Sequence, residues 1–277
     1  TTVENKIAAG DAYTQTLINE GLQYDKDEAE TLVDGVTDET ADPAQEGEDT
    51  ASDNDPAPDP GETFTLTENV ETTDGTAQDD QFNAFTTFSQ IGQVNTLQSG
   101  DTVNGGEGND TLTAQLIGGF GIVPTLNSVE NLELSSVQAG TTLNASSSSG
   151  LETISFADST ASTSVSNVGS PVAFSVANVS GFVQSTLGYT GDSLSGETVQ
   201  PLTLSNVITD DAGAYVQFDD STGSGAIEQL DITVDGKTDI EGIRDANAFV
   251  EEEDEDDVVA GSDVLDGLET VTVNATA

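Results

Sequence analysis

The sequence contains no cysteine, methionine, tryptophan or histidine. Without cysteine and histidine the chain offers no disulfide, no thiol nucleophile, no imidazole base and no sulfur or nitrogen ligand for zinc. Its metal ligands are therefore restricted to oxygen atoms, which are the ligands that calcium prefers. The lack of oxidisable sulfur also suits a protein that persists outside the cell.

Basic residues are almost as scarce, because 4 Lys and Arg stand against 52 Asp and Glu and leave a net charge of −48. Nucleic acids and anionic membrane surfaces both require a basic footprint, so we expect neither as a partner. No apolar run is long enough to span a bilayer, and we expect no membrane insertion. Repulsion among the acids destabilises a compact state unless salt or multivalent cations screen it. We therefore expect high salt or a specific divalent cation in the working environment.

The groups that most enzymes use are also missing. The sequence has no nucleophile elbow, no phosphate-binding loop and no imidazole base. Paired carboxylates can hydrolyse glycosides, but they need a cleft in which one acid has a raised pKa. With 10 Phe, 4 Tyr and no Trp, the chain has few aromatic side chains to line such a cleft. We expect that the protein is not an enzyme.

Residues 1–40 predict a short helical segment. Residues 3–22 carry apolar side chains at helical spacing, and residues 27–35 predict a second, shorter helix. The apolar stripe of the first helix consists of Ala9, Tyr13, Leu17, Ile18 and Leu22. Residues 41–62 contain four prolines, many acids and no large apolar residue. This composition predicts a stiff, extended acidic linker.

Residues 63–277 predict a mainly β domain that binds calcium. Short runs of Thr, Val, Leu, Phe and Ser alternate apolar and polar positions, which is the period of a strand. A weak repeat, apolar-Glu-x-apolar-x-apolar, places its glutamate at Glu130, Glu152, Glu228 and Glu269. We expect a Thr/Ser/Gly-rich β-solenoid or β-roll-like body of stacked coils, with a β-sandwich as the alternative.

The stretch GGEGNDTLT, residues 105–113, crowds glycines, an asparagine and an aspartate before a strand-like Thr-Leu-Thr. Glycine and asparagine tolerate the positive φ angles of a turn that wraps an ion with main-chain carbonyls, and Asp110 adds a carboxylate. A plain acidic hairpin turn is the alternative. Residues 99–104 form a similar half-repeat, and residues 74–83 and 261–267 are fainter relatives.

The nonapeptide matches the pattern G-G-x-G-x-D-x-apolar-x at each fixed position, so it resembles the calcium-binding β-roll repeats of RTX proteins. The wider texture, with short helices before Thr-, Ala- and Gly-rich β segments, resembles bacterial surface-layer proteins and large secreted adhesins. The resemblance implies export, calcium-dependent folding and assembly into a lattice or fibre. The candidate calcium ligands are Asp79, Asp80, Asp101, Asn104, Gly106, Gly108, Asn109 and Asp110.

These observations together predict a secreted structural protein, located outside the cell or at its surface, that depends on Ca²⁺. Its main partner would be further copies of itself in a surface layer or filament, and cell-surface polysaccharide is a second candidate partner. Two alternatives stay open, a glycan- or surface-binding module of a large RTX-type adhesin and an acidic soluble protein adapted to brine. Seven consecutive acids at 251–257 predict a solvated loop or a low-affinity calcium sink.

Overall fold

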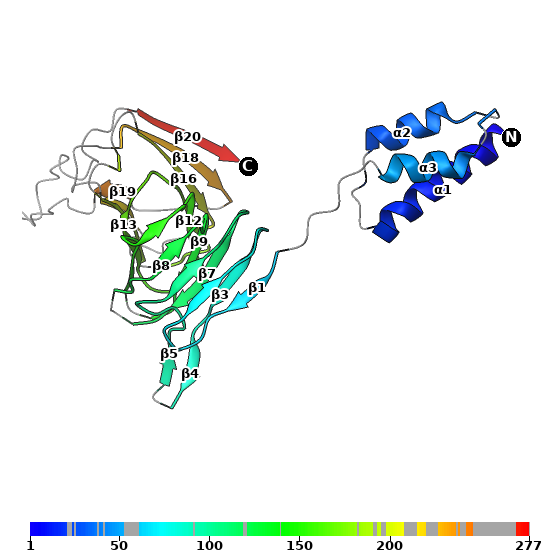
Figure 1. The fold of residues 1–277 in the computed structure, drawn as a ribbon. Helices are drawn as coiled ribbons and strands as arrows, with labels where there is room; N and C mark the ends of the chain where they lie inside the picture. The colour runs from blue at the N-terminus through cyan, green and yellow to red at the C-terminus, as the bar shows by residue number, and fades with distance from the viewer. Residues whose placement is uncertain are drawn as a thin grey trace, which may run out of the picture. The chain divides into compact units, whose positions relative to one another are not determined.

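The chain forms two compact units, Thr1–Asp59 and Pro60–Ala277, the first with helices and the second with strands (Figure 1). The computed structural model describes residues 1–20, 24, 26–37, 39–40, 42–52, 61–90, 92–118, 121–138, 140–181, 183–190, 193–194, 198–207, 215–219, 227–236, 238, 242–245 and 270–276. The acidic run 251–257 and the faint repeat 261–267 lie outside the described residues. Within the described residues, no helix is both long and apolar enough to cross a membrane.

The helical unit is built around one small apolar core. Its described helices are α1 (Thr2–Glu20), α2 (Lys26–Gly35) and α3 (Pro43–Ser52). The buried core residues are Ala9, Tyr13, Leu17, Leu32 and Val36. The predicted stripe of α1 is therefore confirmed at its first three positions. Ile18 is instead 70% exposed, because it lies about 100° around the helix from Leu17, and Leu22 lies outside the described residues.

Helix α3 shows that the prediction of an extended linker over residues 41–62 is wrong for Pro43–Ser52, while residues 53–60 lie outside the described residues. Asp42 accepts a hydrogen bond from the N–H of Gln45 at 3.2 Å, and Pro43 occupies the first helical position, where no N–H is needed. A Cβ on Gly47 would lie 2.1 Å from the carbonyl oxygen of Ala9, so the missing side chain lets α3 pack closely on α1. Burial of backbone against α1 thus supports a helix that apolar content alone did not predict.

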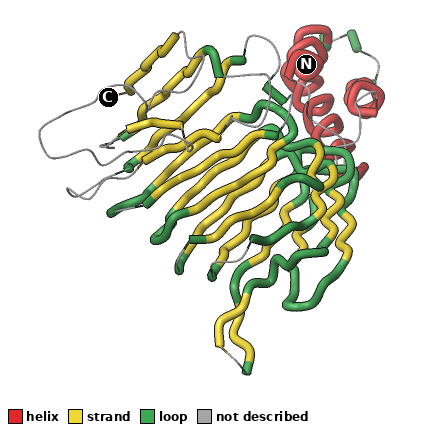
Figure 2. Tube along the Cα trace, turned by 90° about the vertical axis from the view of Figure 1, so that its left-hand side faces the viewer, coloured by secondary structure: helices red, strands yellow, loops and turns green. Residues whose placement is uncertain are grey.

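The β unit is a solenoid in which successive coils each add one strand to a long parallel sheet (Figures 1 and 2). In spatial order the described strands of this nine-stranded sheet are β1 (Thr63–Thr65), β3 (Gln81–Ala84), β7 (Thr111–Leu116), β9 (Asn131–Ser136), β12 (Thr153–Ala157), β14 (Ala173–Ala177), β16 (Val199–Ser205), β18 (Gln229–Asp235) and β20 (Thr270–Thr276). Every neighbouring pair in it is parallel. The solenoid prediction is confirmed, and the β-sandwich alternative is wrong because sandwiches pair strands antiparallel.

The remaining strands close the coils. A five-stranded parallel sheet contains β10 (Thr141–Asn144), β13 (Thr163–Val168), β15 (Gln184–Tyr189), β17 (Tyr215–Asp219) and β19 (Gly242–Asp245). A four-stranded parallel sheet contains β11 (Ser148–Ser149), β8 (Thr125–Asn127), β6 (Thr102–Asn104) and β2 (Thr72–Asp74). One coil is interrupted by an antiparallel hairpin of β4 (Thr87–Ser89) and β5 (Gly92–Val94). Parallel pairing follows from this winding, since each strand meets its neighbour one full coil later.

Alternate residues of each strand point into the solenoid and stack from coil to coil. One such row, which we refer to as the core column, runs through Phe64, Phe82, Leu112, Leu132, Ile154, Phe174, Leu202, Ile232 and Val273. Phe174 makes edge-to-face contacts with Phe156 and Phe218, whose ring centroids lie 5.0 and 5.9 Å away. This continuous apolar row gives the β unit its single core.

The strand register explains the irregular glutamate repeat. Glu130 and Glu152 each lie two residues before the core column, so they are neighbours in adjacent coils. Glu228 lies four residues before the core column residue Ile232. Glu269 lies outside the described residues. The four matches of the repeat therefore do not occupy one structural position.

Candidate functional site

Four turns stack at the edge where the chain enters the nine-stranded sheet. They span residues 75–80, 105–110, 128–130 and 150–152, directly before β3, β7, β9 and β12. Each turn ends in an acidic residue two positions before the core column, and the residue before β1 is also acidic. We refer to these residues, Glu62, Asp80, Asp110, Glu130 and Glu152, as the acidic column.

Hydrogen bonds between coils explain why acids suit this column. Asp80 Oδ1 accepts the N–H of Glu62 at 2.6 Å, and Asp110 Oδ1 accepts the N–H of Asp80 at 2.7 Å. Glu130 Oε2 in turn accepts the N–H of Asp110 at 2.8 Å. Each of these carboxylates satisfies a backbone donor of the preceding coil, which gives it a structural role without any ion.

Glycines make room for the carboxylates. A Cβ on Gly75 would lie 2.6 Å from Asp80 Oδ2 and 2.1 Å from the carbonyl oxygen of Gly105. A Cβ on Gly105 would lie 2.3 Å from Asp110 Oδ2 and 1.7 Å from the carbonyl oxygen of Ser128. In both turns, a carboxylate oxygen of the same turn and a carbonyl oxygen of the next coil lie beside the position that a side chain on the glycine would fill.

The other two glycines of the motif let the turns stack. Gly106 and Gly108 adopt φ angles of +118° and +115°, which side chains strongly disfavour. A Cβ on Gly106 would lie 1.9 Å from the carbonyl oxygen of Thr76, and one on Gly108 would lie 2.7 Å from that of Gln78. Their predicted role as part of an ion-binding turn is therefore accompanied by a packing role that holds the 105–110 turn against the 75–80 turn.

Asp80 and Asp110 occupy equivalent positions but differ in their second oxygen. Asp80 Oδ2 accepts the backbone N–H of Thr76 and also its hydroxyl, the latter at 3.0 Å. The equivalent residue beside Asp110 is Gly106, which has no hydroxyl. Asp110 Oδ2 is buried and has no hydrogen-bond partner. A buried carboxylate oxygen without a partner is unfavourable, so Oδ2 is the atom of this turn that could accept a further donor or a cation.

The difference in hydrogen bonding between Asp80 and Asp110 also affects their pKa values. Burial raises the pKa of Asp110 above its ordinary value, and the negative charges of Asp80, Glu130 and Asp79 raise it further, against the lowering effect of the Asp80 N–H. Burial also acts to raise the pKa of Asp80, but the hydrogen bonds that Asp80 accepts outweigh it and leave that pKa lowered. The fold thus favours the charged form of Asp80 and disfavours the charged form of Asp110.

Asp101 lies at the opposite end of β6 from the 105–110 turn. Its Oδ1 accepts the N–H of Glu71 at 2.9 Å, and its Oδ2 accepts the N–H of Gln98 at 2.6 Å. Burial raises the pKa of Asp101, and the charge of Glu71 adds to this effect against the two hydrogen bonds. With both oxygens already bonded to backbone, Asp101 caps a corner of the coil and does not join Asp110 in one site.

The side chain of Asn104 also makes no contact with the acidic column in its hydrogen bonds. Its Nδ2 donates to Asp74 Oδ1 at 2.6 Å, and its Oδ1 accepts from Asn127 Nδ2 at 2.8 Å, so it belongs to a polar ladder between coils. Asn109 is exposed and donates its N–H to Asp79 Oδ1 at 2.7 Å. The structure thus groups six of the eight predicted ligands in two adjacent turns and places Asp101 and Asn104 elsewhere.

Sequence reasoning missed three participants in this edge, Thr76, Ser128 and Glu130. Glu130 carried a signal, because it belongs to the apolar-Glu repeat and precedes a strand. Ser128 contributes only its carbonyl oxygen, from a backbone with φ of 47°, and nothing in its residue type indicated that. Thr76 matters because its backbone N–H and its hydroxyl donate to Asp80 within the same turn, four residues along the chain.

The oxygen donors at Asp110 are of the kind that calcium accepts. Among the described residues, no three acidic side chains converge closely enough to hold a metal ion. A cation here would depend on Asp110 Oδ2 and on main-chain oxygens such as that of Ser128, a mixture that calcium accepts. No basic residue lies between Lys26 and Lys237 in the sequence, and among the described residues no salt bridge reaches this edge.

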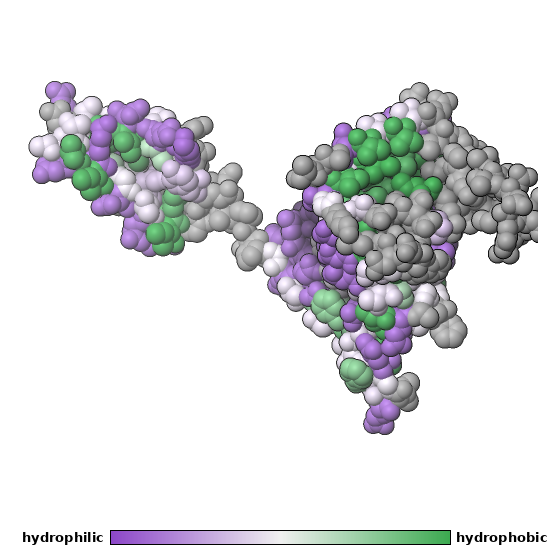
Figure 3. Space-filling view, turned by 180° about the vertical axis from the view of Figure 1, so that it is seen from behind, coloured by the Kyte–Doolittle hydropathy of each residue, from purple (hydrophilic) through white to green (hydrophobic). Residues whose placement is uncertain are grey.

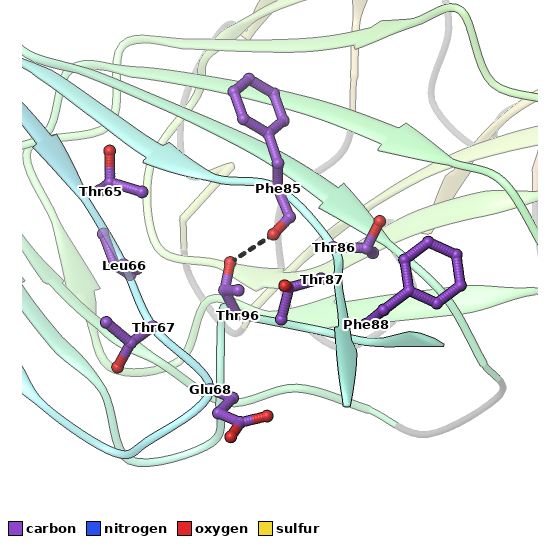
Figure 4. A pocket seen from close by; sticks show the side chains of 9 residues that line it. All are labelled: Thr65, Leu66, Thr67, Glu68, Phe85, Thr86, Thr87, Phe88 and Thr96. Atoms are coloured by element: carbon purple, nitrogen blue, oxygen red, sulfur yellow. Dashed lines mark hydrogen bonds between the residues drawn. The ribbon is translucent and has the colours of Figure 1, made fainter. Parts of the chain in front are cut away.

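A second candidate site is a cavity of about 460 Å³ between the end of β1 and the segment that leads into β4 (Figure 4). Its lining is rich in threonine and includes two exposed aromatic rings, Phe85 at 50% and Phe88 at 83% exposure. Thr96 Oγ1 donates to the carbonyl of Phe85 at 2.9 Å and fixes one wall (Figure 4). Glu68 is the one charged residue of the lining.

Comparison of the chain with known protein families, with curated proteins and with solved structures gave no match in any of the three.

Proposed function

We propose that this protein is a secreted structural protein whose β-solenoid is stabilised by calcium and which assembles with copies of itself into a surface layer or filament. The observation that carries the calcium part is the buried, unpartnered Oδ2 of Asp110 in a turn that matches a calcium-binding repeat. The net charge of −48 supports the same conclusion, since close packing of such chains requires cations between them.

In this proposal the chain's residues prepare the site and calcium supplies positive charge. Gly105 leaves space for Asp110 Oδ2 beside the Ser128 carbonyl oxygen, and the Asp80 N–H holds the other oxygen, Oδ1, in place. Glu130 fixes the Asp110 backbone through its N–H. A bound cation would favour the charged form of Asp110, whose pKa is raised by burial and then by the neighbouring acids. Folding would then be coupled to the calcium concentration outside the cell.

The test compares unfolding and assembly with and without calcium. We expect the purified chain to melt at a higher temperature in about 10 mM calcium than in chelator, because a Kd of about 10⁻⁴ M is typical of extracellular calcium modules. Electron microscopy and sedimentation should show polymers with calcium and dispersed chains with chelator. Potassium chloride at equal or higher ionic strength is the control, and equal stabilisation by potassium would favour the acidic, brine-adapted soluble protein instead.

A second candidate function, binding of a neutral glycan by an adhesin module, is favoured by the threonine-lined cavity. Pockets that bind small ligands combine apolar or aromatic walls with a few polar groups, and the exposed Phe85 and Phe88 rings are available for contact. We expect Phe88→Ala to weaken binding to neutral polysaccharides in a glycan array. Val70→Ala, another exposed apolar residue that does not line the cavity, should leave binding unchanged. Absence of glycan binding by the unmodified chain would exclude this candidate.

A further inference from the structure

The nine-stranded sheet ends at β1 on one side and at β20 on the other. Among the described residues, β1 pairs only with β3 and β20 pairs only with β18. Each end strand therefore presents one row of backbone N–H and C=O groups without a strand partner. Such an edge is a template for a strand of another chain unless something blocks it.

Charged side chains are the usual means of blocking an edge, and both end strands lack them. β20 reads TVTVNAT and β1 reads TFT, without a single acid in a chain that carries 52. By contrast, the neighbouring strand β18 contains Asp231 and Asp235. Within β1 and β20 themselves there is thus no acid to repel a pairing strand, whereas Glu62 directly precedes β1.

β20 also exposes the apolar row that interior strands bury. Val271 and Val273 pair with Leu230 and Ile232, which are 2% and 7% exposed. The two valines themselves are 52% and 60% exposed. Hydrophobic surface lies at this end of the β unit (Figure 3). Solenoids normally cover their terminal coils with a polar cap, and the described residues leave this end open.

The opposite end of the sheet offers a matching surface. The core column begins at Phe64, which is partly buried and stacks on Phe82 with ring centroids 5.0 Å apart, and it ends at Val273. Strand direction is the same at both ends because every pair in the sheet is parallel. A second copy could therefore continue the sheet without changing strand direction or the inward-facing row.

We propose that β20 pairs in parallel with β1 of a second copy, so that Val273 stacks on that copy's Phe64 and Thr272 lies opposite its Thr63. The inference rests on the self-assembly in the proposed function and specifies the surfaces that perform it. A head-to-tail contact of this kind joins two different surfaces and propagates into a filament. Nine strands spaced about 4.8 Å apart predict an axial repeat of roughly 43 Å per copy.

The absence of cysteine makes the register directly testable by cross-linking. In the double variant Thr63→Cys with Thr272→Cys, the two cysteines lie at opposite ends of one sheet and can form a disulfide only between copies. Thr65→Cys with Thr272→Cys is the matched control, because a two-residue offset of roughly 6.6 Å along the strand puts the Cα atoms about 8 Å apart, beyond disulfide reach. After mild oxidation in calcium, we expect a ladder of covalent oligomers for the first pair and mostly monomer for the second.

A third variant, Val273→Asp, places a charge on the exposed end of the core column. We expect it to abolish polymers while leaving the calcium-dependent rise in melting temperature unchanged, since the calcium turns lie in other coils. Polymers that survive this variant, or equal cross-linking of both cysteine pairs, would overturn the inference but leave the proposed function standing. An unmodified chain that forms no polymer in calcium would instead overturn the proposed self-assembly itself.

Discussion

Replacing Asp110 by asparagine should change stability in opposite directions with and without calcium. In chelator, the variant keeps an oxygen to accept the Asp80 N–H. Its new NH₂ group stands where the unpartnered Oδ2 was, close to the carbonyl oxygen of Ser128. The substitution also removes a buried charge whose pKa is raised by burial and by neighbouring acids. We therefore expect the calcium-free variant to be as stable as the unmodified chain or more stable.

In calcium, the unmodified chain should instead be more stable than the Asp110→Asn variant. At about 10 mM calcium and a Kd of about 10⁻⁴ M, binding to the folded state contributes about 2.7 kcal/mol. For a β unit of this size, each kcal/mol raises the melting temperature by roughly 2–4 °C, so the unmodified chain should gain roughly 5–10 °C. Asp110→Asn removes the charged ligand and should lose most of that gain. Thermal unfolding followed by circular dichroism, with titration calorimetry for calcium affinity, measures both quantities.

Asp80→Asn is the matched control, because Asp80 holds the same turn position one coil earlier. Both of its oxygens accept hydrogen bonds, and its pKa is lowered by hydrogen bonds that outweigh burial. Its neutralisation should therefore destabilise the fold by about 1–3 kcal/mol in chelator and in calcium alike. If Asp110→Asn behaves like Asp80→Asn in chelator, or keeps the full calcium gain, the assignment of the ion to Asp110 is wrong.

Three further predictions concern pH and packing. In chelator, the raised pKa values of Asp101 and Asp110 mean that the folded state takes up protons first, so their contribution to stability should grow as pH falls through those values and be complete below 3.8; melting curves against pH check this. Gly47→Ala should destabilise the helical unit by about 1–3 kcal/mol through overpacking, whereas Gly10→Ala, with open space around it, should stabilise α1 by about 0.5–1 kcal/mol in denaturant titration. Phe174→Ala should cost about 3–5 kcal/mol in the same assay, because the ring is 1% exposed at the centre of the core column.

The coarse fold could be predicted because its signals are local. Alternation over short Thr- and Val-rich runs predicted strands, and the glycine-rich turn before Thr111 predicted a tight corner that leads into one. Helix α3 was missed because its support is partly tertiary, with Gly47 packed against the backbone of Ala9. Asp42 and Pro43 were nevertheless a readable start signal that the acidic, proline-rich composition obscured.

The candidate site was predictable in composition and not in detail. The motif drew attention to Asp110, and to Asp80 as part of a fainter relative, yet the structure provides partners for both oxygens of Asp80 and leaves Asp110 Oδ2 without one. The difference arises from Thr76 and Gly106, which each lie four residues before the aspartate of their turn. The turn sequence does not show that Asp110 Oδ2 is buried without a hydrogen-bond partner, because that burial depends on how neighbouring coils pack.

The rest of the solenoid supplies a comparison for the acidic column. Two residues before the core column, the coil of β14 has Val172 in place of an acid, and its N–H donates to the Tyr189 hydroxyl at 3.4 Å. In the next coil Gln200 takes the equivalent place and donates Nε2 to the Val172 carbonyl at 3.0 Å. Neutral side chains can therefore satisfy the backbone N–H and C=O groups at this edge of the coil. Because capping alone does not require acids, the concentration of charge in the coils from Glu62 to Glu152 supports the proposed cation, and the unpartnered Oδ2 of Asp110 lies within these coils.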